Sequence, residues 1–309
     1  MAPADASSPD DRSNERAKAR TLHHAAYTAE RIAQERERQA VSVSVCLPAR
    51  ECAATVGEIV AALAALRDAG ALDRIVVVDA ASADATAEIA AEAGAEVWQE
   101  SELLQSFGPV LGKGDAMWRA VSALDSDAIC FIDADSERFS AHFACGLIGA
   151  LVCEPDVSFV KGFYRRPFPG DAVGAEQGGR VNHLTARPAL ELFYPELAQI
   201  RQPLAGEVAA RRELLQRLPF ATGYGVEIAM LIDAWQAVGV EQIAQVDLDE
   251  HHNHHQPLAA LSEMALTVLA TIARRLQDEG RLMPDGGSHA APLERPPLSS
   301  LADLQAGRS

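Results

Sequence analysis

Two aspartates, Asp133 and Asp135, are separated by one alanine and directly follow the apolar run 128–132. That run has the composition of a buried β-strand. Ligands of open α/β sheets bind at the carboxyl ends of the strands, so both carboxylates are expected at such an edge. Carboxylate oxygens suit Mg²⁺ and Mn²⁺, and Mg²⁺ is usually shared with substrate phosphates. The pattern favours a divalent-metal site over the alternative, an acidic turn after a strand.

Two further groups that could do chemistry begin predicted helices. Lys113 lies between two glycines at the start of a predicted helix over 113–123, where it could bind a phosphate or remain a solvated lysine. Glu227 follows the stretch 223–225 (GYG) and begins the apolar helix predicted over 226–238. A carboxylate at this position could hydrogen-bond sugar hydroxyls, or it could simply cap the helix.

The formal net charge is −17, from 44 acidic and 27 basic residues. A protein that binds nucleic acid or an anionic membrane would usually carry the opposite sign. An anionic substrate would therefore need a local cluster of cations, and the segment 161–187 supplies one. Its basic residues are Lys161, Arg165, Arg166, Arg180 and Arg187. The stretch 178–182 (GGRVN) combines backbone amides with a guanidinium, a combination that can bind a phosphate or a carboxylate. We therefore favour an anion-binding loop over the alternative, a surface loop without a ligand.

Four histidines and Asn253 occupy positions 251–255, after the strand predicted over 243–248. Contiguous side chains cannot all face one ion, so we expect one or two of them to contact a metal or a phosphate. Asp79 ends the strand predicted over 74–78. It could contact a ribose or a base, or it could cap the next helix.

The elements that position these groups alternate along the first half of the chain. Strands are predicted over 41–47, 74–78, 95–98, 128–132, 157–163 and 243–248. Helices are predicted over 55–66 (with Thr55 as a possible N-cap), 85–93, 113–123, 187–197, 206–217, 226–238 and 257–276. This order predicts an α/β fold with a mostly parallel sheet and helices on both faces.

The chain of 309 residues, 48% of them hydrophobic, suits a single large globular domain, predicted over 21–283 between disordered tails at 1–20 and 284–309. No apolar run approaches the roughly 20 residues of a membrane span. The polar N-terminus lacks a secretory pattern. Five cysteines without metal-type spacing indicate reduced thiols and a cytoplasmic protein. The first strand is followed by no glycine-rich motif, which argues against a dehydrogenase and a nucleotidyltransferase.

Several sequence blocks occur together and in one order: LPAR, VVVDAASADAT, GKGDAMWR, DADS, SFVKGFYRRP, GGRVNHLTARP, QPLAGE and LPFATGYGVEI. In this combination the chain resembles the glucosyl-3-phosphoglycerate synthases, a family of retaining glycosyltransferases. The resemblance implies a GT-A type fold and a homodimer. The nucleotide-binding half would span about 41–136 and the C-terminal acceptor-binding part about 137–283. It also implies transfer of glucose from UDP-glucose to the 2-hydroxyl of 3-phosphoglycerate with Mg²⁺ (or Mn²⁺).

The resemblance further implies roles for individual residues. Donor binding would involve Pro48, Ala49, Glu51, Lys113, Asp135, Leu204 and Glu227. Acceptor binding would involve Gly179, Arg180, Asn182 and His255. The metal ligands would be Asp135, Asn253 and His254. Catalysis would depend on Asp133, Lys113 and Glu227, with no protein nucleophile required.

The chain departs from the family pattern at a few of these positions. Cys52 and Ala80 replace a usual glutamate and serine, and Asn182 replaces a threonine. The family's Arg-x-His after the strand 243–248 is His251 and Asn253 here. Three alternatives therefore stay open: GDP-mannose as donor, glycerate as acceptor, or a nucleotide-sugar-binding protein without catalytic activity.

Overall fold

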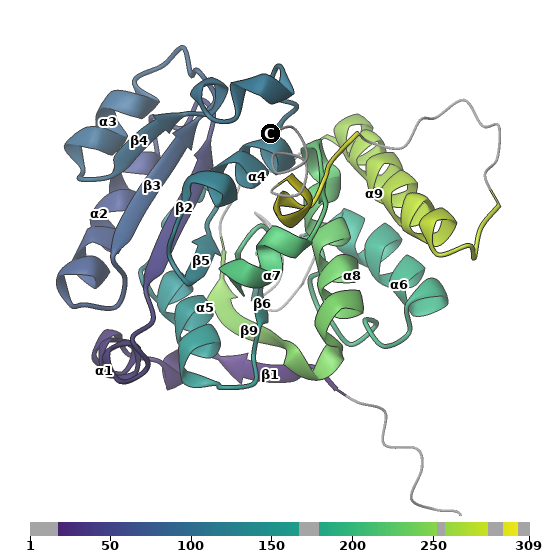
Figure 1. The fold of residues 1–309 in the computed structure, drawn as a ribbon, viewed down its shortest axis with the longest axis horizontal. Helices are drawn as coiled ribbons and strands as arrows, with labels where there is room; N and C mark the ends of the chain where they lie inside the picture. The colour runs from purple at the N-terminus through teal and green to yellow at the C-terminus, as the bar shows by residue number, and fades with distance from the viewer. Residues whose placement is uncertain (1–17, 167–178, 252–256, 284–292, 302–309) are drawn as a thin grey trace, which may run out of the picture.

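The computed structural model describes residues 18–166, 179–251, 257–283 and 293–301. Its centre is an eight-stranded sheet in the order β1-β9-β6-β7-β5-β2-β3-β4 (Figure 1). The strands are β1 (Arg20–His23), β2 (Val43–Ala49), β3 (Arg74–Asp79), β4 (Glu96–Gln99), β5 (Ala128–Phe131), β6 (Phe159–Arg165), β7 (Val208–Arg211) and β9 (Ile243–Glu250). Neighbours are parallel except at β7, which pairs antiparallel with β5 and β6. The predicted mostly parallel sheet is confirmed.

Helices cover both faces of this sheet. They are α1 (Ala29–Gln39), α2 (Val56–Asp68), α3 (Thr86–Glu92), α4 (Lys113–Ala123), α5 (His142–Cys153), α6 (Arg187–Phe193), α7 (Arg212–Arg217), α8 (Val226–Val238) and α9 (Leu258–Asp278). One core cluster joins α1, α2, α3 and α5 to one face of the sheet. A second cluster joins the helices α4, α6, α7, α8 and α9 to the other face. Val76 and Val77 of β3 belong to different clusters, so β3 is covered on both of its faces. This explains why its sequence is apolar throughout and does not alternate. None of the described helices is long and apolar enough to cross a membrane.

The predicted boundaries agree closely where the apolar periodicity is strong. The helices predicted over 113–123 and 226–238 are α4 and α8 without change. The helix predicted over 206–217 is wrong in its first half, because Val208–Arg211 form β7 and only Arg212–Arg217 are helical. The short sequence VAAR has good helix formers, but here its backbone hydrogen bonds are made to β5 and β6.

Both terminal regions contribute more than the sequence indicates. The predicted tail 1–20 is wrong at its end, because Ala19 is buried and Arg20 begins β1. The predicted tail 284–309 is wrong over 293–301, where β10 (Glu294–Arg295) pairs antiparallel with β8 (Phe220–Ala221). Residues 1–17, 284–292 and 302–309 of these tails lie outside the described residues.

Arg295 explains why the C-terminal segment is ordered. Its guanidinium donates to the fully buried carboxylate of Asp115 in α4 at 2.7 and 2.8 Å, and Arg119 donates to the same carboxylate at 3.1 Å. The guanidinium also lies over the rings of Phe107 and Trp118. Burial alone would raise the pKa of Asp115, but these two arginines lower it. A buried charge needs such partners, so the C-terminal segment completes the core around α4.

We expect Arg295→Ala to lower the free energy of unfolding by about 3 kcal/mol, the usual cost of breaking a buried ion pair. Denaturant titration followed by circular dichroism measures this loss. Arg274→Ala is the matched control, because Arg274 forms an exposed helical pair with Asp278 and its loss should cost less than about 0.5 kcal/mol. Equal losses in both variants would show that the Arg295 pair does not hold the segment.

Candidate active site

The carboxyl ends of β2, β3, β5, β6 and β9 lie at one edge of the sheet, because these strands run in the same direction (Figure 1). β7 runs the opposite way, so its first residues reach the same edge. The segments that follow β5, β6 and β9, together with Glu207 before β7, therefore come together there. This is where a ligand site of an open α/β sheet is expected.

Lys113 joins two of the predicted site carboxylates. Its Nζ donates to Asp133 Oδ1 at 2.5 Å and to Glu227 Oε1 at 2.8 Å. Desolvation lowers the pKa of the Lys113 ammonium, but the two carboxylates more than compensate and raise that pKa well above its usual value. The structure thus brings together the three residues that the sequence analysis named as catalytic.

Glycines allow this arrangement at the beginning of α4. Gly112 has a φ of 89°, a backbone conformation that side chains disfavour. A Cβ atom on Gly114 would lie 1.9 Å from the carbonyl oxygen of Ala221, so only glycine lets α4 approach β8 this closely. The close approach places Lys113 between β5 and α8, within reach of both carboxylates.

Asp133 and Asp135 have different surroundings. Asp133 lies directly over Gly206, where a Cβ atom would come within 2.2 Å of its carboxylate. Asp135 is exposed, yet desolvation by the surrounding protein and the charge of Asp133 both raise the pKa of its carboxyl. A bound cation would relieve that repulsion, and the oxygen ligands suit a hard divalent ion.

The loop that carries these aspartates is held from α2. Thr55 is the residue before α2, but its side chain does not cap the helix as the sequence suggested. Its hydroxyl instead donates to the carbonyl oxygen of Ala134 at 2.6 Å. The helix start therefore fixes the backbone between the two aspartates.

Glu207, which the sequence analysis did not single out, is completely buried beside this loop. Its Oε2 accepts a hydrogen bond from the hydroxyl of Tyr164 at 2.8 Å, and its Oε1 lies 3.2 Å from Nε2 of His251. The same Nε2 is 2.9 Å from Oγ of Ser136. Burial alone would raise the pKa of Glu207, but His251 and Tyr164 lower it to about 2. One buried anion thus connects the ends of β5, β6 and β9.

Two members of the predicted basic cluster point into the protein to different degrees, Lys161 being fully buried and Arg166 half-buried. Lys161 is fully buried and donates to the carbonyl oxygen of Ala205 at 2.6 Å. Burial lowers the pKa of Lys161 to about 8. Arg166 donates to the hydroxyl of Tyr164 at 2.8 Å and lies over its ring. The expectation that the whole basic cluster serves an anionic substrate is therefore wrong for Lys161, whose ammonium is buried against a backbone carbonyl.

The predicted acceptor segment is linked to the predicted donor loop. Asn182 is buried, and its Oδ1 accepts a hydrogen bond from the backbone amide of Leu204 at 3.0 Å. Gly179 has a φ of 73°, and its carbonyl oxygen accepts from the amide of His183 at 3.1 Å. Arg180 follows in the first helical turn before the π-helical stretch Asn182–Ala186. Asn182 therefore positions this segment against residue 204.

The predicted nucleotide side lies at the ends of β2 and β3. Pro48 and Ala49 are the last residues of β2. Glu51 follows with a φ of 54°; its amide donates to Oγ of Ser82 and its Oε1 accepts from the amide of Ala83. Asp79 is buried and accepts from Ser82 and Gln99, so the suggestion that it caps the next helix is wrong.

Asn253, His254 and His255 lie outside the described residues, so the structure does not place the predicted metal and acceptor contacts of that loop. Among the functional candidates, sequence reasoning missed Glu207, Tyr164 and Ser136. One signal was present for Tyr164, which directly follows the strand predicted over 157–163, whereas Glu207 fell inside a predicted helix and gave none.

Comparison with known proteins agrees with this geometry. The family model described as "Glycosyl transferase family 2" matches residues 44–166. The glucosyl-3-phosphoglycerate synthase of Petrotoga mobilis is 43% identical over 267 residues, which are 85% of this chain and 82% of the relative. The chain belongs to the glucosyl-3-phosphoglycerate synthase family. The corresponding synthase of Mycolicibacterium smegmatis is 39% identical over 84% of this chain and 90% of its own length.

Solved structures show the same fold. Mannosyl-3-phosphoglycerate synthase from Rubrobacter xylanophilus is 42% identical, with a TM-score of 0.84 over 91% of this chain and 96% of that one. Glucosyl-3-phosphoglycerate synthase from Mycobacterium tuberculosis, in complex with Mn²⁺, UDP-glucose and phosphoglyceric acid, is 35% identical, with a TM-score of 0.80 over 92% and 99%. The protein is a glycosyltransferase with a GT-A type α/β fold.

We expect Glu207→Gln to lower the free energy of unfolding at pH 7 by roughly 3 kcal/mol, because the buried carboxylate that joins Tyr164 and His251 is lost. The pKa of Glu207 in the folded protein is about 2, below its value of roughly 4.3 in the unfolded chain. The ionised carboxylate therefore stabilises the fold fully at pH values above the unfolded pKa. This contribution is lost as the pH falls from about 4 towards 2.

Denaturant titrations of both proteins at pH 7, 5, 4 and 3 check this expectation. The difference between wild type and Glu207→Gln should shrink in the acid range. Glu88→Gln serves as the control, because Glu88 is exposed. A difference that stays constant down to pH 3 would show that Glu207 carries no stabilising charge.

Proposed function

We propose that this protein transfers glucose from UDP-glucose to the 2-hydroxyl of 3-phosphoglycerate, with retention at the anomeric carbon and with a divalent cation. The observation that carries the proposal is the Lys113–Asp133–Glu227 arrangement at the sheet edge next to Asp135. It is supported by the M. tuberculosis relative, whose structure holds Mn²⁺, UDP-glucose and phosphoglyceric acid. The identity of 43% to a named synthase supports the same reaction.

Asp135 would hold the cation, Mg²⁺ or Mn²⁺, with a second ligand from Asn253 or His254. A bound divalent ion supplies positive charge to the departing diphosphate. The residues at the site fit this group, because two carboxylates follow one strand end, and desolvation together with the charge of Asp133 raises the pKa of Asp135, an effect that a bound cation would oppose. Lys113 would add a second positive charge on the donor side of the site.

Glu227, held by Lys113, would orient the donor sugar through its hydroxyls, with Leu204 beside it. Pro48, Ala49 and Glu51 would contact the nucleotide. The acceptor would be bound by Gly179, Arg180, Asn182 and His255. Arg180 would orient the charged groups of the acceptor through charge-assisted hydrogen bonds.

The acceptor hydroxyl would attack the face of the sugar from which the diphosphate leaves, and would give its proton to that phosphate. No side chain would therefore serve as nucleophile. The nucleotide-binding half would span 41–136 and the acceptor-binding half 137–283.

A second candidate donor is GDP-mannose. The solved structure with a TM-score of 0.84 and 42% identity is named a mannosyl-3-phosphoglycerate synthase, which is as similar to this chain as the glucosyl enzymes are. The two donors differ in the base and in the configuration of one sugar hydroxyl. The side chains proposed to meet the sugar, Leu204 and Glu227, therefore bear on this choice.

A product assay distinguishes these reactions. Purified protein, Mg²⁺ and 3-phosphoglycerate are incubated with UDP-glucose or GDP-mannose, and parallel samples contain glycerate as acceptor. We expect a glucosyl product from UDP-glucose that is lost with EDTA, and an α-anomer by NMR coupling constants. Mannosyl transfer alone would change the donor and keep the mechanism. Metal-dependent UDP binding without transfer from either donor would overturn the proposed reaction.

We expect Asp135→Asn to reduce transfer by at least about 100-fold, because the site loses the anionic ligand of the cation. Initial rates at saturating UDP-glucose and increasing Mn²⁺ measure the loss. Asp125→Asn is the matched control, because Asp125 is exposed and lies before β5, at the opposite edge of the sheet. Near-native activity of Asp135→Asn would contradict the metal assignment.

Arg180→Ala should raise the KM for 3-phosphoglycerate on the order of 10- to 100-fold, since a hydrogen bond between charged groups contributes about 1.5–3 kcal/mol. The KM for UDP-glucose should change little. Arg38→Ala is the control, because Arg38 is an exposed arginine in α1 that pairs with Glu35. If both KM values rise equally in Arg180→Ala, Arg180 does not act on the acceptor.

A further inference from the structure

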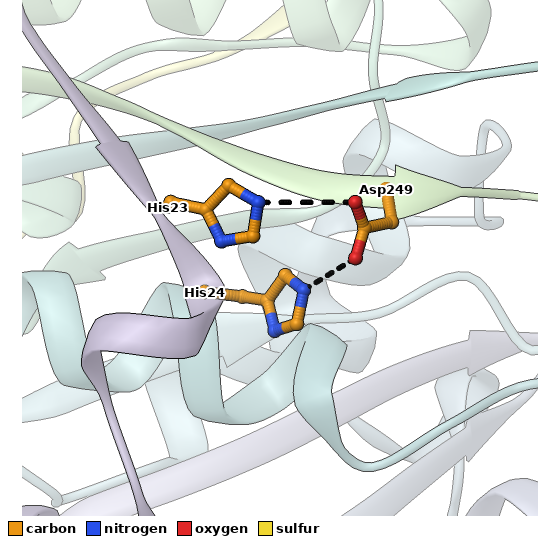
Figure 2. A group of neighbouring side chains, drawn as sticks. All are labelled: His23, His24 and Asp249. Carbon is orange, nitrogen blue, oxygen red and sulfur yellow. Dashed lines mark hydrogen bonds and ion pairs between the residues drawn. The ribbon is translucent and has the colours of Figure 1, made fainter.

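Two histidines and an aspartate converge on one another where β1 ends (Figure 2). Nε2 of His24 is 2.6 Å from Oδ2 of Asp249, and Nε2 of His23 is 3.8 Å from Oδ1 of the same carboxylate. All three residues offer ligand atoms that lie within 4.8 Å of one another. We refer to these three residues as the His–His–Asp cluster. It shares no residue with the proposed substrate site.

The fold, and not chain proximity, assembles the cluster. β1 pairs in parallel with β9, and the register sets His23 opposite Asp247, two residues before Asp249. Neighbouring residues of a strand normally point to opposite faces. Here the strand ends at His23 and the 3₁₀ turn His24–Ala26 begins, so both imidazoles face Asp249 (Figure 2).

The surroundings of His24 hold its ring in place. His24 packs on α5 at Gly146, where a Cβ atom would lie 2.9 Å from the Cβ of His24. Its ring lies against that of His142, with centroids 4.3 Å apart. His142 is itself fixed by Ser140 and by the carbonyl oxygen of Leu248, at 2.9 and 3.0 Å. A ligand ring with little freedom loses little entropy when it binds an ion.

We propose that the His–His–Asp cluster binds a divalent transition-metal ion of the zinc type. Two imidazoles and one carboxylate suit zinc and its neighbours, whereas Mg²⁺ prefers oxygen ligands alone. Zinc bonds of about 2.0–2.1 Å in a tetrahedral site place neighbouring ligand atoms about 3.3 Å apart. The present separations of 2.6 and 3.8 Å lie on either side of that value, so small side-chain movements suffice.

Access and charge also fit an ion at the cluster. The side chains of His23 and Asp249 are about half exposed, at 51% and 48%, which leaves an entry path and room for water as a further ligand. The carboxylate of Asp249 brings an anionic oxygen between the two imidazoles, as a divalent ion requires. Nδ1 of His23 accepts from the amide of Ala25, and this exposed amide can bond to water when metal binding moves the imidazole proton.

Such an ion would join β1, at the edge of the sheet, to the end of β9. Because binding stabilises the folded state only, saturating zinc should raise the melting temperature by on the order of 5 °C. β9 leads through His251 into the loop that holds Asn253 and His254. The cluster would therefore fix the end of β9, which precedes the residues proposed as ligands of the catalytic metal.

The test must separate the cluster from the histidines of that loop, which can bind zinc themselves. Zinc binding is measured by equilibrium dialysis in excess Mg²⁺ on the full chain carrying His252→Ala, His254→Ala and His255→Ala together. We expect one zinc ion per chain in this background. Adding Asp249→Asn or His23→Ala should weaken its binding at least tenfold and remove the rise in melting temperature. Adding His183→Ala, at an exposed histidine, should change neither quantity.

X-ray absorption at the zinc edge supplies a second readout that folding defects do not imitate. We expect two imidazoles, oxygen ligands and no sulfur in the zinc coordination. Circular dichroism of the metal-free variants checks that Asp249→Asn retains the fold. The proposal is overturned if the loop-histidine background binds no zinc, if Asp249→Asn binds it equally well, or if sulfur is a ligand.

Discussion

Glu207 is a fully buried carboxylate at the point where the ends of three strands meet. The strand ends have to supply the hydrogen-bond donors that replace water around it. β6 supplies the hydroxyl of Tyr164, and the residue after β9 supplies the imidazole of His251. The loop after β5 joins through Ser136, next to the aspartates of the proposed metal site. An unpaired carboxylate in this position would cost several kcal/mol, so the strand ends are fixed relative to one another. The geometry of the whole edge follows from that requirement.

Much of the fold was predictable, because its strongest signals are local. The apolar periodicity of α4 and α8 determines both of their boundaries, and the apolar runs of β3 and β5 identify buried strands. The failures share a different cause. β1, β7 and β10 are short strands of ordinary composition, and each becomes a strand only through a partner far away in the chain. Local propensity cannot report such a partner.

The candidate site divides in the same way. Asp133, Lys113 and Glu227 were predictable because each occupies a marked position, after a buried strand or at the start of a helix. Glu207 and Tyr164 were not, because their importance depends on β7 lying antiparallel between β5 and β6. Lys161 shows the opposite error. It contributes positive charge to its segment in the sequence, but in the fold its ammonium is buried against a backbone carbonyl.

The pairing of β1 with β9 also bears on how the chain is made. The register joins Arg20 to Ala244, so the first strand to leave the ribosome has to wait for almost the last. At about 5–20 residues per second that interval is roughly 10–45 s. In the last part of this interval β6 also lacks β9 on one side and presents an unpaired edge to other chains. A nascent chain of this protein therefore passes through a period in which its growing sheet has an open edge that other chains can pair with.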